Sequence, residues 1–164
     1  MCTPPHRLEA ASLGARQMLA HYLAAPAQQH ATLIAQLRPR ATDYRAVFAP
    51  VLAATSAERG YVQLWGNEPV WPVPNEPQLE VYAATANEIA KNARGTQAFP
   101  AGYLDIACWL RPSVIWIAWS VKGRGNGHGT LYDGLVEIEP GRWAWFPRPW
   151  KVLPPPAHSS VYWE

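Results

Sequence analysis

Apolar residues recur at helical spacing through the first third of the chain. Residues 3–26 place one apolar face at intervals of three and four, which is typical of an amphipathic helix. A second helix is expected from Pro26 to Pro39, because the residue before a proline resists the α conformation. A third starts at Thr42 or Asp43, and Pro50 predicts a kink or break within it. The three apolar faces comprise Leu8, Ala11, Ala15, Met18, Leu19, Tyr22 and Leu23; Leu33, Ile34 and Leu37; and Tyr44, Val47, Phe48, Val51 and Leu52.

The pattern changes to strands after Gly60. Residues 61–65 ("YVQLW") predict a short strand, and a proline-rich loop follows that cannot hold a sheet ladder because each proline removes a donor. Residues 78–83 alternate as a half-buried strand does. Three more strands are expected at 113–121, 130–138 and 143–146, with a type II turn over 139–142. The last three strands therefore predict an antiparallel meander.

Two short helices are expected between the alternating strand and this meander. Thr85 and Glu88 form a capping box, and Gly95 is a natural residue at which that helix ends. Pro100 opens the next helix, which ends at Pro112. Its inward-facing residues are expected to be Tyr103, Ile106, Ala107 and Leu110, and Cys108 is expected to be a small core residue.

The composition fits one folded domain. The chain has 164 residues, of which 49% are apolar and 16% charged, enough to bury a core. We predict a single α+β domain over residues 1–153, with N-terminal helices packed on a curved antiparallel sheet. Its helical part spans 4–59 and its sheet-rich part 60–153, and residues 154–164 form an extended or loose tail.

Charge and motifs exclude several classes of function. The formal net charge is +2 and scattered, which gives no footprint for nucleic acid or an anionic membrane. No apolar run approaches the roughly 18 residues of a membrane-spanning helix, and no signal peptide pattern is present, so a cytoplasmic location is expected. The five histidines are far apart and pairing of Cys2 with Cys108 has no support, so we expect no metal, cofactor or disulfide.

Nine tryptophans stand out in the composition. Indole rings belong either in a core with a polar exit or in a binding surface. We expect most of these tryptophans to lie in the core, because aromatic strands are usually buried, and the alternative is that some line a pocket or a partner surface. By strand alternation, Trp143 and Trp145 share one face of the sheet, whereas Trp116 and Trp119 point to opposite faces. Trp71 and Trp150 lie outside regular ladders, where rigid prolines can present a ring, so we expect these two to serve recognition.

Asp133 is the acidic residue with the most unusual setting. It lies within an apolar strand, where a carboxylate must be paired, hydrogen-bonded or shifted in pKa. One interpretation makes it a general acid/base or ligand anchor in a cavity lined by Tyr103, Trp116 and Trp119. The other is structural, with a bond to a loop amide or to an arginine, Arg142 or Arg148.

The glycine-rich segment 123–129 ("GRGNGHG") predicts a flexible hairpin loop. A phosphate cradle needs a helix N-terminus behind it, and here a strand follows. Arg124 and His128 in this loop can still contact an anionic ligand or a partner.

Two segments, "FPAGYLDIACWLRP" (99–112) and "YDGLVEIEPGRWAWFPRPWKVL" (132–153), are similar to segments of uncharacterised bacterial proteins. The order of elements over residues 40–150 resembles the cystatin-like cone of the nuclear-transport-factor-like superfamily. That resemblance implies a curved sheet around a pocket of the cyclase or dehydratase kind, an immunity protein, or a dimeric scaffold. Its enzymes often use a His/Asp pair; Asp133 matches the acid, but no histidine lies in a neighbouring strand.

The leading hypothesis is a small non-catalytic binding protein, such as a bacterial immunity or regulatory protein, that binds a partner protein through aromatic and proline-rich loops. The alternative is a small-molecule-binding protein or an enzyme with Asp133 in a pocket of the sheet. A third hypothesis is a homodimer formed through exposed sheet faces. The residues expected to bind a partner are Trp71, Trp143, Trp145, Trp150, Arg124, His128 and Arg148.

Overall fold

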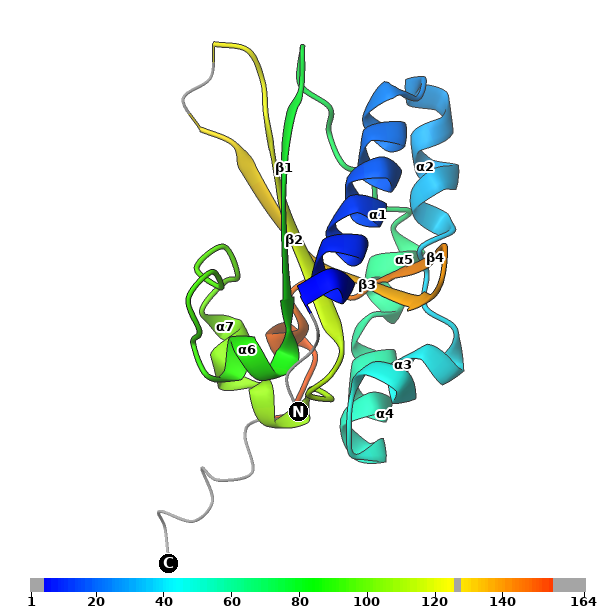
Figure 1. Ribbon diagram of the computed structural model, residues 1–164. Helices are drawn as coiled ribbons and strands as arrows, with labels where there is room; N and C mark the ends of the chain where they lie inside the picture. The colour runs from blue at the N-terminus through cyan, green and yellow to red at the C-terminus, as the bar shows by residue number, and fades with distance from the viewer. Residues whose placement is uncertain (1–4, 126–127, 155–164) are drawn as a thin grey trace, which may run out of the picture.

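The helices and the sheet form layers in which α1 and α2 lie beside one face of the sheet (Figure 1). The structure is a computed structural model that describes residues 5–125 and 128–154. Short helices from the middle of the chain pack against the other face, where Tyr103 contacts Trp116. The α+β class and the packing of N-terminal helices against an antiparallel sheet are confirmed.

The first part of the described chain is helical. The face predicted for the first helix is confirmed, since Ala11, Ala15, Leu19 and Tyr22 are buried. The break predicted at Pro50 is also confirmed, because one helix ends before it and another begins directly after it. The helices are α1 (Pro5–Ala24), α2 (Ala27–Ala35), α3 (Ala41–Val47), α4 (Val51–Gly60) and α5 (Val62–Gly66).

Two predictions in this helical part are wrong. Val51 and Leu52 are 62% and 70% exposed, because the break at Pro50 gives α4 its own helical phase and Ala53, Ala54 and Ala57 are buried instead. The strand expected at 61–65 is helical. Its two buried rings, Tyr61 and Trp65, stand four residues apart, which is helical spacing, and the Trp65 amide donates to the Tyr61 carbonyl at 3.2 Å.

The sheet has four antiparallel strands in the order β1-β2-β3-β4. The meander of the last three strands is confirmed, and β1 extends it by pairing with β2 in register from Leu79↔Val121 to Thr85↔Ile115. The sheet is not strongly curled or closed, unlike the cone that the family resemblance implies (Figure 1). The strands are β1 (Gln78–Thr85), β2 (Ile115–Lys122), β3 (Thr130–Glu139) and β4 (Arg142–Trp145).

Short helical turns follow β1 and β4. The capping box is confirmed, because the Glu88 amide donates to Thr85 Oγ1 and the Thr85 amide donates to Glu88 Oε1, both at 3.1 Å. The helix predicted from Pro100 is split into two turns, and Cys108 is exposed rather than buried; Cys2 lies outside the described residues. The turns are α6 (Ala86–Ala90), α7 (Gly102–Asp105), the 3-10 helix η1 (Ala107–Trp109) and the 3-10 helix η2 (Pro149–Lys151).

The core occupies both faces of the sheet, as strand alternation requires. Trp119 packs against Trp71 on the face covered by α1, with ring centroids 4.9 Å apart. Trp116 packs against Tyr103 of α7 on the other face, with centroids 5.5 Å apart. The opposite orientation predicted for Trp116 and Trp119 is therefore confirmed.

A β-bulge at Gly134 shapes the centre of β3. The register shifts between Ile117, which pairs with Leu135, and Ala118, which pairs with Asp133. Gly134 takes up the extra position with φ of 97°, a left-handed value that favours glycine. Its carbonyl accepts the Phe146 amide at 2.7 Å, so the bulge also fixes the end of β4.

A buried carboxyl and a candidate binding groove

Asp133 is buried and hydrogen-bonded within the fold. It is 6% exposed, and its Oδ1 accepts the Tyr103 hydroxyl at 2.7 Å and the Arg148 backbone N–H at 2.8 Å. The predicted structural role, a bond to a loop amide, is confirmed, whereas the Arg142 guanidinium binds Asp43 instead. Burial raises the pKa of Asp133, although both hydrogen bonds and the nearby Arg148 charge act against that rise.

Further hydrogen bonds hold the end of β4 and the segment after it. The Trp145 indole N–H donates to the Asp133 carbonyl at 2.9 Å, and the Tyr61 hydroxyl donates to the Pro147 carbonyl at 2.8 Å. Arg148 has φ of 47°, an uncommon backbone conformation for a residue other than glycine. The Asp133 bond to the Arg148 amide therefore helps to hold a strained turn in place.

The residues expected to line a pocket beside Asp133 are instead packed in the core. Tyr103 and Trp116 have no exposed surface and touch each other, while Trp119 lies on the opposite face beside a void of about 10 Å³. None of the four cavities described within residues 5–125 and 128–154 is lined by Asp133.

Two substitutions of Asp133 distinguish the contribution of its hydrogen bonds to stability from the contribution of its charge. We expect Asp133→Asn to stay within about 1 kcal/mol of the wild type at neutral pH, because an amide oxygen still accepts both donors. Asp133→Ala is expected to cost about 2 kcal/mol, because the buried Tyr103 hydroxyl loses its acceptor. Urea denaturation of both variants measures these differences.

The pH dependence of the same variants has a defined sign. Because folding raises the pKa of Asp133, the folded protein binds this proton more tightly than the unfolded chain. The carboxyl's contribution to stability therefore increases as pH falls through the folded pKa towards the unfolded value. Asp133→Asn lacks that increase, so its stability relative to the wild type should decline on acidification. A difference that does not vary with pH would contradict this prediction.

The tryptophans named as binding residues are mostly buried. Trp71 is 5% exposed, because its backbone N–H and carbonyl both bond to the Tyr22 hydroxyl, at 2.9 and 2.8 Å, which fixes the proline-rich loop on α1. Trp145 is 6% exposed and packs against Trp71. Trp150 is half-buried against Tyr103. The expectation that rigid prolines present the Trp71 ring for recognition is therefore wrong.

The charged candidates of the loops are exposed but do not form one cluster. Arg124 forms an ion pair with Glu76 at 3.1 Å, and both side chains are more than half exposed. His128 is exposed in the same β2–β3 loop. Arg148 follows β4 beside Asp133, several positions along the sheet from that loop. The exposed ion pair of Arg124 and Glu76 adds little to the stability of the fold.

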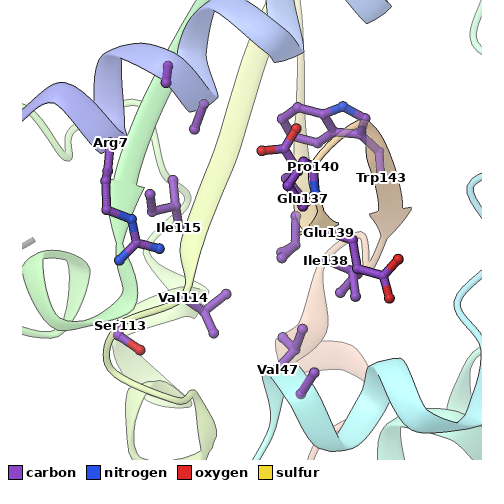
Figure 2. Close-up of a pocket in the computed structure, with 14 residues that line it drawn as sticks. Arg7, Val47, Ser113, Val114, Ile115, Glu137, Ile138, Glu139, Pro140 and Trp143 are labelled. Carbon is purple, nitrogen blue, oxygen red and sulfur yellow. The ribbon is translucent and has the colours of Figure 1, made fainter.

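A groove of about 430 Å³ lies between the start of α1, the end of α3 and the β3–β4 hairpin. Apolar side chains make up much of its lining, among them Val47, Val114, Ile115 and Trp143. Figure 2 shows Arg7 of α1 on one side of the groove beside Ile115, with Glu137 and Trp143 of the hairpin on the opposite side. Trp143 is therefore the predicted binding residue that the structure places at a concave surface.

Some of the charged side chains around this groove have ion-pair partners and others do not. Arg142 binds Asp43 through two hydrogen bonds of 2.8 and 2.9 Å, and its Nε lies 3.5 Å from Glu139. Glu137 accepts one hydrogen bond, from the Gly141 amide at 3.3 Å. Within the described part of the chain, neither Glu137 nor Arg7 has an ion-pair partner. The groove therefore presents an unpaired positive charge on one wall and an unpaired negative charge on the other.

The sequence contains one signal for this groove. Glu137 shares a strand face with Leu135, which has no exposed surface, so a charged residue stands where alternation predicts a core residue. Such a position indicates that the strand face is no longer fully covered at that point, and Glu137 is exposed in the structure. Arg7 has no comparable signal, because a charged residue in the first turns of a helix is common.

Two of the other described cavities lie between helices. One of about 410 Å³ lies between α3 and α4, and another of about 330 Å³ lies between α2 and α5. Residues 5–125 and 128–154 contain no group of three or more His, Cys, Asp or Glu side chains that could hold a metal ion. Over the same residues, every helix is too short or too polar to span a bilayer.

Comparison of the chain with protein-family models, with curated proteins and with solved structures gives no match. The α+β architecture and the groove therefore carry the functional argument by themselves.

Proposed function

We propose that this protein is a small non-catalytic binding protein that takes a segment of a partner protein in the groove between α1 and the β3–β4 hairpin. An immunity or regulatory role is consistent with this kind of binding. The observation that carries the proposal is the groove's apolar lining with unpaired charges on both walls. Partner segments commonly bury apolar side chains in such a surface and place charges at its rim.

The proposal moves the binding surface from the loops to the groove. Trp71 and Trp145 are occupied in core packing, so they leave little ring surface for a partner. Trp143 lines the groove and contributes an aromatic wall there, although most of its own surface is buried. Aromatic side chains that line a concave surface are frequent anchors in protein interfaces.

An enzyme or small-molecule-binding protein that uses Asp133 is the second candidate. The raised pKa of Asp133 favours it, since perturbed carboxyls are common at functional sites. A loss of a measured activity or ligand in Asp133→Asn, with stability unchanged, would support this candidate over the binding protein. Homodimerisation is a further candidate that light scattering at several protein concentrations tests.

Peptide selection followed by NMR mapping tests the proposed function. A phage-displayed library of twelve-residue peptides is selected on the immobilised protein, and the selected peptides are titrated into ¹⁵N-labelled protein. We expect the amides of Ala10, Val47 and Ile115 and the indole N–H of Trp143 to shift. Leu131, which is 46% exposed on β3, serves as the control and should not shift. Failure to select any peptide, or shifts confined to other surfaces, would refute the proposal.

A further inference from the structure

We propose that the groove selects a peptide segment carrying both signs of charge, with a lysine or arginine seated beside Glu137 and Trp143 and an acidic residue facing Arg7. This inference rests on the proposed function, and it specifies the chemistry of the partner segment. It follows from which charges at the groove already have partners and which do not.

Among residues 5–125 and 128–154, Glu137 has no cationic partner, because the neighbouring Arg142 guanidinium already binds Asp43. Arg142 is held by Asp43 in a bidentate pair, and its Nε lies 3.5 Å from Glu139. Glu137 instead accepts a hydrogen bond from the uncharged backbone amide of Gly141. In Figure 2 the Glu137 carboxylate lies beside the Trp143 ring, on the side of the groove. A cation from a bound segment would therefore meet an uncompensated carboxylate.

The wall next to Glu137 suits the long stem of a basic side chain. Trp143 and Pro140 line it, and Trp143 is held from behind by α1, where a Cβ added to Gly14 would lie 3.3 Å from the indole Cζ2. Lysine and arginine bury their methylene stems on apolar surface while the charged head stays at a polar rim. The apolar wall and the carboxylate therefore fit one basic side chain.

Arg7 places a positive charge on the groove wall opposite Glu137. It stands on the α1 side, opposite the hairpin, and has no acidic partner within the described residues. A purely basic segment would meet repulsion from Arg7, and a purely acidic one would meet repulsion from Glu137. A segment with a basic and an acidic residue on either side of an apolar residue satisfies both walls and covers the apolar lining between them.

Substitution of the charged residues in both the protein and the selected peptide, with measurement of the binding affinity, tests this inference. The probe is the best-binding synthetic peptide from the selection, used together with a version in which its basic residue is glutamine. We expect Glu137→Gln to weaken binding of the first peptide about two- to fivefold at low salt. The glutamine peptide should bind both proteins with that same reduced affinity. Glu137→Lys should weaken binding of the basic peptide about tenfold or more, because like charges then face each other.

Matched controls remove general effects of charge and folding. Glu68→Gln changes an exposed glutamate next to α5 and should leave the affinity unchanged. Arg7→Gln should relax the preference for an acidic residue, whereas Arg94→Gln, an exposed arginine elsewhere, should not. Trp143→Phe keeps an apolar ring and should also weaken the basic peptide, which provides a second variant if charge changes at Glu137 disturb the hairpin.

The outcomes separate this inference from the proposed function. If selected peptides shift groove amides but need no basic residue, or if Glu137→Gln leaves their affinity unchanged, the inference is overturned and the binding groove stands. If no peptide reaches the groove, both fail. If lysine amide alone binds as tightly as the peptide, the assignment to a peptide segment is overturned in favour of a small amine.

Discussion

Replacing Gly134 by alanine is expected to lower the free energy of unfolding by about 4 kcal/mol. Gly134 has φ of 97°, where side chains are strained, and an added Cβ would lie 2.8 Å from Pro147 Cα and collide with the Phe146 carbonyl group. The obstacle is backbone on the neighbouring strand end, so no side chain can rotate away to relieve it. Urea denaturation followed by tryptophan fluorescence measures the loss.

Gly141→Ala is the matched control for that experiment. Gly141 also has a left-handed φ, of 81°, but nothing lies within 4 Å of an added Cβ. Only the backbone strain remains, which costs about 1 to 2 kcal/mol. Equal losses at the two glycines would show that the close approach of Phe146 does not matter, contrary to the structure.

Asp43→Ala is expected to destabilise the protein by about 3 to 5 kcal/mol, because it leaves the partly buried Arg142 without its carboxylate. Asp43 is 1% exposed, binds both ends of the Arg142 guanidinium, and accepts the Arg40 amide at 2.8 Å. The pair joins α3 to the β3–β4 hairpin. Glu139→Gln removes the exposed partner of the same arginine and should change stability by less than about 0.5 kcal/mol. A similar loss in both variants would contradict the assignment.

The ion pair between Asp43 and Arg142 also makes the stability of the fold depend on pH in the acidic range. Burial alone would raise the pKa of Asp43, but hydrogen bonds from Arg142 and the Arg40 amide, together with the charges of both arginines, lower that pKa below its usual value. The unfolded chain therefore binds this proton more readily than the folded protein does. The stabilisation is complete above the unfolded pKa and is lost as pH falls through the folded pKa. The gap between wild type and Asp43→Ala should narrow in that acidic range, opposite in sign to the effect of Asp133.

The same ion pair also bears on binding. It holds the hairpin that carries Glu137 and Trp143, two of the residues assigned to the partner segment. Loss of Asp43 should therefore weaken peptide binding as well as folding, whereas Glu137→Gln should weaken binding alone. Comparing the two variants distinguishes a residue that positions the groove wall from one that contacts the ligand.

Local signals in the sequence predicted much of the architecture. The apolar face of α1, the break at Pro50 and the capping box of Thr85 and Glu88 each depend on neighbours within a few positions. The turn at Gly141 and the antiparallel meander follow from the same kind of information. Such signals act through backbone conformation and side-chain periodicity within a few positions of the chain.

The candidate site was predictable only in part. Trp143 was named as a binding residue, and it lines the groove, but Arg7 and Glu137 were not named. These residues meet because α1 crosses the sheet near the hairpin, a contact between segments more than a hundred positions apart. Asp133 was correctly given a bond to a loop amide, yet its second partner, Tyr103, depended on how α7 packs on the sheet.

By itself, the sequence determined the α+β class, the helix ends set by prolines and caps, and the alternation that sends Trp116 and Trp119 to opposite faces. Tertiary structure alone decided that Trp71 is buried, since the Tyr22 hydroxyl fixes its loop from 49 positions away. It also decided that residues 61–65 are helical and that Arg7 faces Glu137 across a groove. The physical reason is that periodicity constrains each segment against its own neighbours, whereas burial and charge pairing depend on which distant segments come into contact.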